Sequence, residues 1–297
     1  MAKTKLQSFI ADEVDKVKGI CVPVHASRLE RALVRKVNCN KLHPNPDDEF
    51  CFPEIGPNES IISNYEKDYR RAGSDRTSAR MIGSGIAEPL DVQKIHPSGY
   101  MILNGHHRWI AAIRTGMSRL PVRIVNLTQE KEIRKMLELS KHDKRITLDL
   151  EEVVFVTGKD EKMEKSLSFP LNRIYFDRLR LGIPSLFAYL TGRGYDIWLY
   201  SSGYESVDYV RELLKLYHTH VTGIITGTAR KAPKDVKTLK ELEALMASKY
   251  SYTIHADKSL LLCVNSRTKE YREYPLSGDA VWSAEIIDII GAMEKNA

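Results

Sequence analysis

The sequence predicts an α/β protein of two domains, on three observations. The chain has 297 residues, a length typical of two domains rather than one. After residue 145, apolar strand-like runs alternate with amphipathic helical segments, which indicates a parallel sheet covered on both faces. The charged segment 128–144 interrupts the apolar runs, so we expect a connecting helix there, between domains at 1–127 and 145–297.

The first domain is expected to mix helices and strands, as in an α+β fold. Apolar residues from Leu6 to Val17 follow a helical spacing, which predicts a helix over 5–18. Four prolines between Leu42 and Ser60 predict an irregular loop. The other elements expected here are a short helix or strand lead at 27–37, a helix at 61–73, strands at 89–95 and 99–104, a helix at 105–116 closed by Gly116, and a strand at 120–127.

The second domain is expected to follow a β-α-β order. Residues 146–156 are mostly apolar, which predicts a strand buried on both faces. The elements expected after it are a helix at 176–194, a strand at 195–202, a helix at 207–219, a strand at 221–227, a helix at 234–249 and a strand at 251–257.

The composition favours a cytoplasmic protein that meets anionic partners. The net charge is +6 and the pI about 9.0, which suits nucleotides, phosphorylated metabolites or nucleic acid. No apolar run approaches the roughly 20 residues of a membrane span, so we expect no membrane partner. The N-terminal segment is polar and contains acids, unlike a signal peptide. The four cysteines form no CxxC pair, which argues against a disulfide framework or zinc cluster.

Residues 105–108 read Gly-His-His-Arg, where a predicted strand ends and a predicted helix begins. A helix N-terminus carries unpaired N–H groups, and Gly105 allows a ligand to approach them closely. Arg108 can bind a phosphate through two hydrogen bonds. We interpret Asn104 to Arg108, with His106 and His107 as further donors, as a phosphate cradle. In the alternative, the histidines cap the helix and Arg108 forms a surface salt bridge; a metal site is disfavoured because adjacent helical residues point about 100° apart.

The segment from about Val37 to Val125 resembles the ParB/sulfiredoxin fold. The resemblance rests on N-C-N-K-L-H-P-N-P, E-P-L-D-V, Y-M-I-L-N-G-H-H-R-W-I-A-A-I-R-T-G and L-P-V-R-I-V. It implies that the glycine-led helix start binds nucleotide phosphates. Sulfiredoxins have a catalytic cysteine where this chain has His106. Partition-type ParB proteins, which bind CTP, have G-E-R-R there and a helix-turn-helix region that this sequence lacks. The G-H-H-R form is most similar to the free-serine kinases, which read D-G-H-H-R, with Asn104 in place of their aspartate.

The resemblance to these kinases also implies a catalytic base from an early loop, where they use a glutamate to activate the substrate hydroxyl. The loop at 42–60 offers Glu49, Glu54 and Glu59. A carboxylate near a phosphate cradle can deprotonate a hydroxyl or hold Mg²⁺. The sequence does not select one of the three, and solvated loop acids are the alternative interpretation.

Asp149 and Glu151 are expected near the end of a buried strand. Residues i and i+2 of a strand face the same side, so the two carboxylates would lie together. The carboxyl ends of parallel strands are where α/β folds bind ligands. One carboxylate could attack phosphorus while the other transfers a proton.

The stretch from about Arg145 onward resembles the haloacid dehalogenase (HAD) superfamily, an α/β/α sandwich of the Rossmann type. Asp149-Leu150-Glu151 matches its D-x-D motif. The resemblance implies that Asp149 is the nucleophile and a Mg²⁺ ligand. Glu151 stands where most of these phosphatases have an aspartate as general acid, and it would also ligate the metal.

Three later motifs carry the same resemblance. I-W-L-Y-S-S-G places Ser201 and Ser202 where the phosphoryl group binds. A-R-K-A-P-K-D supplies Lys231, or alternatively Lys234, as the lysine that offsets the charge of an aspartyl-phosphate. I-H-A-D supplies Asp257 as the fourth-motif metal ligand. The second acid often found near this position is missing, which leaves an active phosphatase and a degenerate domain both open.

Together these features predict a nucleotide-binding phosphoryl-transfer protein, a phosphotransferase or phosphohydrolase. Its first domain would hold a kinase-like or NTPase-like site, and its second a Mg²⁺-dependent phosphatase-like site. The expected cofactors are Mg²⁺ and ATP or another nucleotide, with a small phosphorylated or hydroxyl-bearing substrate. Two alternatives stay open, a nucleic-acid end-processing enzyme or nuclease and a non-catalytic regulator that senses a nucleotide.

Overall fold

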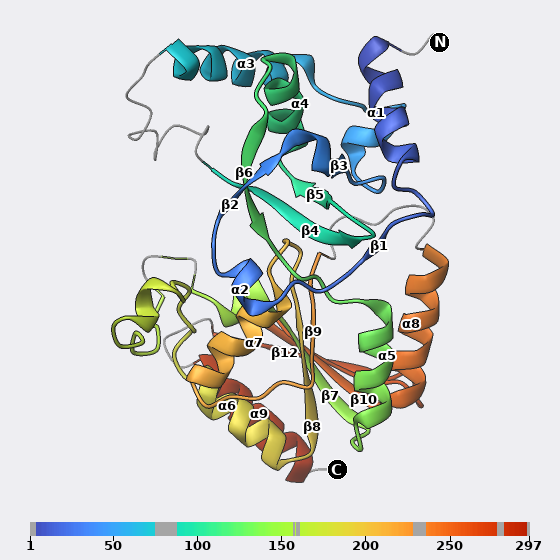
Figure 1. Ribbon diagram of the computed structural model, residues 1–297. Helices are drawn as coiled ribbons and strands as arrows, with labels where there is room; N and C mark the ends of the chain where they lie inside the picture. The colour runs from blue at the N-terminus through green and yellow to red at the C-terminus, as the bar shows by residue number, and fades with distance from the viewer. Residues whose placement is uncertain are drawn as a thin grey trace. The chain divides into compact units, whose positions relative to one another are not determined.

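The chain forms two compact units, Met1–Leu127 and Thr128–Ala297 (Figure 1). The computed structural model describes residues 4–74, 88–156, 158, 161–227, 236–277 and 282–295. A helix was expected to connect the two domains, and it is α5 (Glu130–Leu139), which belongs to the second unit. Just before α5, the Thr128 hydroxyl donates a hydrogen bond to the Ile224 carbonyl in the sheet (2.6 Å).

The first unit is built on a mixed sheet whose strand order is β2-β6-β4-β5-β3, with β1 pairing the far end of β4. β4 and β5 form the expected antiparallel hairpin, and β6 lies parallel to β4. β3 falls inside the region predicted as an irregular loop, because a strand this short shows no alternation in sequence. The strands are β1 (Val22–Pro23), β2 (Arg35–Asn38), β3 (Leu42–Pro44), β4 (Leu90–His96), β5 (Tyr100–Asn104) and β6 (Arg119–Ile124).

Helices α1 (Lys5–Asp15), α3 (Glu59–Ser74) and α4 (His106–Arg114) lie on one side of this sheet (Figure 1). The three helices predicted at 5–18, 61–73 and 105–116 are therefore confirmed. A short fourth helix, α2 (Arg28–Arg31), precedes β2, so the segment 27–37 contains both of the elements proposed for it. The apolar face of α4 buries Trp109 and Ile110 in the core of the unit, which fixes α4 against the strands.

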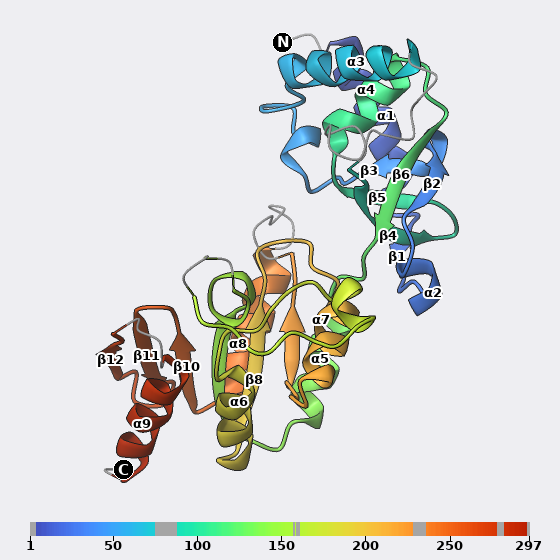
Figure 2. The ribbon, with the colours of Figure 1, turned by 90° about the vertical axis from the view of Figure 1, so that its left-hand side faces the viewer.

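The second unit is built on a sheet of order β12-β11-β10-β7-β8-β9 (Figure 2). β7 to β10 are parallel as predicted, but β11 and β12 run antiparallel to their neighbours, so the sheet is mixed rather than wholly parallel. The chain passes from β7 to β8 on one side and returns to β10 on the other, so the strand order reverses at β7. The strands are β7 (Lys144–Asp149), β8 (Tyr195–Tyr200), β9 (Gly223–Ile225), β10 (Tyr252–Ala256), β11 (Leu260–Asn265) and β12 (Tyr271–Pro275).

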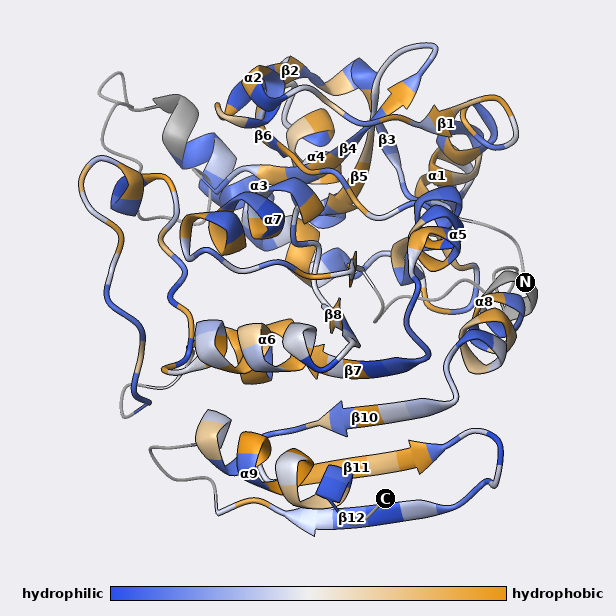
Figure 3. Cartoon of the chain, turned by 90° about the horizontal axis from the view of Figure 1, so that it is seen from below, coloured by the Kyte–Doolittle hydropathy of each residue, from blue (hydrophilic) through white to orange (hydrophobic). Residues whose placement is uncertain are grey.

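Helices cover both faces of this second sheet (Figure 1). α5 and α8 (Val236–Lys249) pack on one face, around Trp198 and Tyr250. α6 (Ile183–Gly192), α7 (Val207–Leu216) and α9 (Trp282–Lys295) cover the other face, against the larger apolar core that includes the hydrophobic strand β11 (Figure 3). Within the described part of the chain, none of these helices combines the length and apolar composition needed to cross a bilayer.

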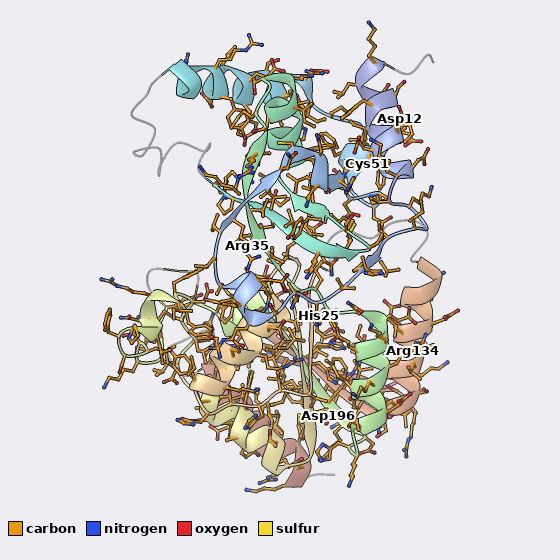
Figure 4. The ribbon with its side chains drawn as sticks, viewed as in Figure 1. Asp12, His25, Arg35, Cys51, Arg134 and Asp196 are labelled. Atoms are coloured by element: carbon orange, nitrogen blue, oxygen red, sulfur yellow. The ribbon has the colours of Figure 1, made fainter. Side chains whose placement is uncertain are left out.

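A buried polar network fastens α5 and α8 to this sheet. Asp196 of β8, labelled in Figure 4, accepts hydrogen bonds from the Tyr250 hydroxyl (2.7 Å) and from His142 Nδ1 (2.9 Å). Tyr250 in turn accepts from Trp198 Nε1 (2.9 Å). A buried carboxylate is costly unless it is hydrogen-bonded, so these donors make Asp196 compatible with the interior.

Two predicted elements of the second unit are wrong, both near the candidate site. The strand expected at 146–156 ends at Asp149, and a single π-helical turn, Leu150–Val154, follows it. The cause is local, because the Asp149 side chain accepts the Glu152 N–H (2.7 Å) and so caps the turn. The helix expected at 176–194 begins only at Ile183, since the chain before it forms extended bridges, including Phe155 to Leu179.

Gly223 supplies a test of packing in the second unit. A Cβ at this position would lie 2.3 Å from two ring carbons of the fully buried Trp198. We expect Gly223→Ala to lower the free energy of unfolding by about 1–3 kcal/mol, because overpacking forces the indole out of place. Urea unfolding measures this, with Gly192→Ala as control, since nothing lies within 4 Å of a Cβ there. Equal stability of the two variants would contradict the packing argument.

Candidate functional site

Helix α4 begins directly after strand β5 through a glycine that no other residue can replace without strain. Gly105 has φ 101° and ψ 23°, in the left-handed region. A Cβ would lie 2.8 Å from Leu90 Cγ. The first helical bond is donated by the Trp109 N–H to the Gly105 carbonyl (3.0 Å). The amides of residues 106–108 therefore precede the helical ladder and face the start of the helix.

His106 faces the protein interior rather than the surface that an anion would reach. It is 3% exposed, and its Nε2 accepts the Asn45 N–H (3.2 Å). The ring is therefore neutral with its proton on Nδ1, which lies 3.7 Å from Asp48 Oδ2, and the ring also meets the Ile102 backbone. Burial lowers the pKa of His106 to about 3. This geometry replaces the predicted phosphate contact with a structural role.

His107 has the same kind of role on the neighbouring side. Its Nε2 accepts the Asn58 N–H (3.1 Å), immediately before α3, and burial lowers its pKa. The Phe50 ring stacks on His106 (5.2 Å between centroids) and meets His107 edge-on (5.1 Å). Two neutral imidazoles and one phenyl ring thus hold the 45–58 loop against the start of α4; we call His106, His107 and Phe50 the histidine clamp. The contact between this loop and the histidines was not predicted from the sequence. Asn58, a residue type that often caps helices, is the sequence feature that marks where the loop ends and α3 begins.

Arg108 is buried beside Gly105, with 4% exposure. Its Nη1 donates to the Glu88 carbonyl (2.5 Å) and lies 3.4 Å from the exposed Glu88 carboxylate. Nη2 and Nε lie 3.0 and 3.2 Å from the position that a Cβ of residue 105 would take. Within the described residues, these two nitrogens make no hydrogen bond. The guanidinium edge therefore lies next to the bare backbone of Gly105.

The candidate loop acids separate into distinct environments. Glu59 is paired with Arg114 (2.7 Å), and this hydrogen bond lowers the pKa of Glu59. Glu49 and Glu54 are exposed, and Glu49 adjoins Phe50 of the histidine clamp. Asn104, the last residue of β5, is also exposed. Glu49 and Glu59 each adjoin a residue held at the start of α4, Phe50 and Asn58, but the Glu59 carboxylate is engaged by Arg114.

In the second unit, the parallel register brings the expected residues to one edge of the sheet. Asp149 ends β7 and pairs in register with Tyr200, the neighbour of Ser201. On the other side, Leu148 pairs with Ala256, so Asp257 follows at the level of Asp149. Adjacent strands lie about 4.8 Å apart, which places these three strand ends side by side.

Glu151 and Ser201 form a closed pair at this edge. The Ser201 hydroxyl donates a short hydrogen bond to Glu151 Oε1, which also accepts the Gly203 N–H (3.4 Å). Glu151 Oε2 is buried and has no partner among the described residues. Asp149 caps the π-helical turn, and burial raises its pKa, with the nearby Glu151 adding to the shift. The Ser201 hydroxyl therefore bonds a carboxylate in this structure, where the sequence predicted that it would bind phosphate.

The residues predicted to hold Mg²⁺ do not converge on one point. No group of three or more His, Cys, Asp or Glu side chains among the described residues is arranged to hold a metal ion. Glu151 is engaged with Ser201, and Asp257 is an exposed residue whose carboxylate accepts its neighbour's amide. Ser202 is exposed at the same edge, while Lys231 and Lys234 lie outside the described residues. As arranged, the side chains do not fit a three-carboxylate metal site.

Comparison with known families finds a match to the ParB N-terminal domain over residues 67–140. The matched segment, about a quarter of the chain, runs from α3 to α5 and contains the whole of β4, β5, α4 and β6. The phosphate-cradle residues from Asn104 to Arg108 lie inside it, whereas Glu49, Asp149 and Ser201 lie outside. No curated protein matches the chain. The similarity thus covers the first candidate site and none of the second.

The histidine clamp predicts a specific dependence of stability on pH. The unfolded chain binds a proton at each imidazole near pH 6.5, whereas folded His106 resists protonation down to about pH 3. The stability that neutral His106 supplies is fully present above pH 6.5 and is lost as the pH falls toward 3, by up to about 1.4 kcal/mol per pH unit. Urea unfolding at a series of pH values between roughly 7.5 and 5 measures how steeply the free energy of unfolding falls with pH.

The matched variants for this experiment are His106→Gln and His220→Gln. We expect His106→Gln to flatten the pH dependence, because its amide does not titrate. His220 is exposed, so its replacement should leave the slope of the wild type unchanged. Parallel curves for all three proteins would refute the structural role of His106.

Proposed function

We propose that the first unit binds the phosphate groups of a nucleotide at the start of α4. The observation that carries this proposal is the juxtaposition of the bare Gly105 backbone, the amides of residues 106–108 and the buried Arg108 edge. Helix N-termini bind phosphate through such amides, assisted by the helix dipole. Arg108 adds two N–H groups in a fixed plane, which suits two phosphate oxygens.

The ligand phosphate would compete with an internal carboxylate. Glu88 lies 3.4 Å from Arg108 Nη1 and is 69% exposed at its side chain, so it can move toward solvent. Its charge opposes an incoming anion, while its carbonyl keeps Nη1 in place (2.5 Å). The Glu88 carboxylate would therefore lower the affinity for phosphate without itself contacting the phosphate.

Two further features support a nucleotide as the source of the phosphate. The match to the ParB N-terminal domain covers this segment, and such a domain is compatible with binding a nucleotide or a nucleic acid. The G-H-H-R motif resembles that of the free-serine kinases, which favours transfer of a phosphoryl group to a hydroxyl. In that reaction Glu49 is the base we favour, because the histidine clamp fastens its neighbour Phe50 to His106 and His107.

The proposal predicts opposite effects of two substitutions on nucleotide affinity. Arg108→Met should weaken the binding of ATP, CTP or GTP at least tenfold, equivalent to about 1.4 kcal/mol, because a charge-assisted pair is lost. Glu88→Gln should tighten binding several-fold, since it removes a competing charge. Isothermal titration with and without Mg²⁺ measures both, and Arg119→Gln, an exposed position on β6, serves as the control.

Two results would count against nucleotide binding at α4. One is unchanged affinity in Arg108→Met, provided that thermal unfolding shows this variant to be folded. The other is binding of single-stranded DNA in place of mononucleotides, with an affinity that falls steeply as salt is added. That second result would favour the nucleic-acid alternative for this basic chain.

A second candidate function, phosphate-ester hydrolysis, is favoured by the strand ends of the second unit. Asp149, Ser201 and Asp257 follow three neighbouring parallel strands, at the edge where the strand order reverses. This order and the D-x-E, S-S-G and I-H-A-D motifs support the resemblance to the HAD superfamily. The Asp149 carboxylate would bond to phosphorus as the ester P–O bond breaks, and the alcohol would leave with a proton from Glu151, the expected general acid. Water would then cleave the aspartyl-phosphate, releasing inorganic phosphate and restoring Asp149.

The closed Glu151–Ser201 pair is the obstacle to this second function. Glu151 is one methylene longer than aspartate and reaches the Ser201 hydroxyl and the Gly203 amide. Both groups would have to be released to meet a phosphate. The carboxylates of the described residues are not gathered around one point, so no step of this second function is assigned to the expected Mg²⁺.

Asp149→Asn should lower the rate of any hydrolysis of para-nitrophenyl phosphate by about a hundredfold or more, because the nucleophile is removed. Release of para-nitrophenol in the presence of Mg²⁺ measures it. Glu49→Gln is the matched control, since it alters a carboxylate of the other unit and should leave this hydrolysis unchanged. Equal rates in Asp149→Asn and the wild type would refute Asp149 as nucleophile.

A further inference from the structure

A second concave site lies at the opposite edge of the second sheet, where the parallel strands begin. It is a pocket of about 530 Å³, within the range of small-molecule sites. The strands β7, β8 and β10 contribute their first residues, Lys144, Tyr195 and Tyr252. Figure 2 shows α9 alongside β10, β11 and β12, and its last turn supplies Met293 and Glu294 to the lining.

The pocket floor is apolar and uncharged. Tyr252 and Cys263 lie in the interior of the lining, and burial raises the pKa of both groups, so both stay protonated. Cys263 also contacts the Met293 sulfur (3.8 Å). Tyr271 is 68% exposed and pairs with Val264, so its side chain lies on the sheet face opposite to Tyr252, Cys263 and Arg272. A planar ring could therefore pack against the Tyr252 ring, as aromatic pairs prefer.

A basic side chain lies at each end of the pocket, and only one of the two has an acidic partner among the described residues. At one end, Lys144 is paired with Glu294 (3.1 Å), which Arg193 also binds, and the Lys144 ammonium lies 4.5 Å from the Tyr195 ring centroid. At the other end, Arg272 lies opposite Cys263 in the β11–β12 register. It forms no salt bridge within the described part of the chain.

The rim carries one acid, Glu270, beside this arginine. It accepts a hydrogen bond from the Thr268 hydroxyl (3.1 Å) and is exposed. Its charge would oppose an anion at Arg272, so Glu270 provides a variant that should act in the opposite direction to loss of the arginine.

From these contacts we propose that the pocket binds a small planar aromatic anion, such as an aromatic carboxylate. Its ring would pack against Tyr252, and its anionic group would bind the guanidinium of Arg272, which lies on the same face of the sheet. A carboxylate and a guanidinium can share two parallel hydrogen bonds. The site is independent of the proposed nucleotide and phosphatase functions, because it lies in the second unit at the starts of strands whose ends carry Asp149 and Ser201, roughly 15–20 Å away.

The test uses anilinonaphthalene sulfonate, an aromatic anion that fluoresces in apolar sites, titrated into the full chain. We expect one saturable site in the wild type. Arg272→Gln should weaken it at least tenfold, and Tyr252→Leu, which removes the aromatic ring, should weaken it several-fold. Glu270→Gln should tighten it. Arg267→Gln, an exposed residue of the same turn that does not line the pocket, should leave it unchanged.

Competition then identifies the chemistry of the ligand. Benzoate should displace the probe, whereas benzylamine, of similar size but opposite charge, should not. Arg272 is exposed, so Arg272→Gln should fold, and thermal unfolding checks that both variants are folded. Many weak sites that are insensitive to Arg272→Gln, or equal displacement by benzoate and benzylamine, would overturn the proposal. Because Arg108→Met and Asp149→Asn lie elsewhere, they should leave probe binding intact even if both proposed functions fail.

Discussion

The first unit depends on two imidazoles that must stay neutral. His106 and His107 each accept a backbone N–H from the loop before α3, and their rings hold Phe50 between them. A protonated ring has no free lone pair, so it cannot accept these bonds. The clamp therefore fixes the loop and the start of α4 together. In the proposed cradle, phosphate binding would therefore fall to the backbone amides and Arg108 rather than to the histidines.

An equally local interaction shapes the second unit. Asp149 caps the turn that follows β7, which ends the strand and turns Glu151 toward Ser201. The same carboxylate that terminates the strand is thus the one placed at the reversal of the strand order. The buried Glu151 Oε2, without a partner among the described residues, shows that the pair is not fully satisfied. The proposed phosphatase function requires this pair to open, because Ser201 bonds Glu151 in the structure.

The two units combine features that favour anions at separate places. The proposed cradle at Gly105 would use backbone amides, whereas the proposed pocket beside α9 would use Tyr252 and Arg272. The positive net charge of +6 is consistent with both, but it does not locate either one. The two arginines differ in their surroundings, since Arg108 is buried beside Gly105 whereas Arg272 is exposed at the rim of the pocket.

The sequence by itself determined most helices and strands, because their apolar spacing is a local property that β4, β5 and α4 carry in a few residues. It also determined the positions of Gly105, Arg108 and Asp149, since their neighbours mark the ends of strands. Only the tertiary structure decided that His106 points inward, that Glu151 binds Ser201 and that β11 and β12 extend the sheet. Each of these depends on partners far along the chain, such as Asn45 for His106, and spacing along a sequence does not reveal which distant backbone group will meet a side chain.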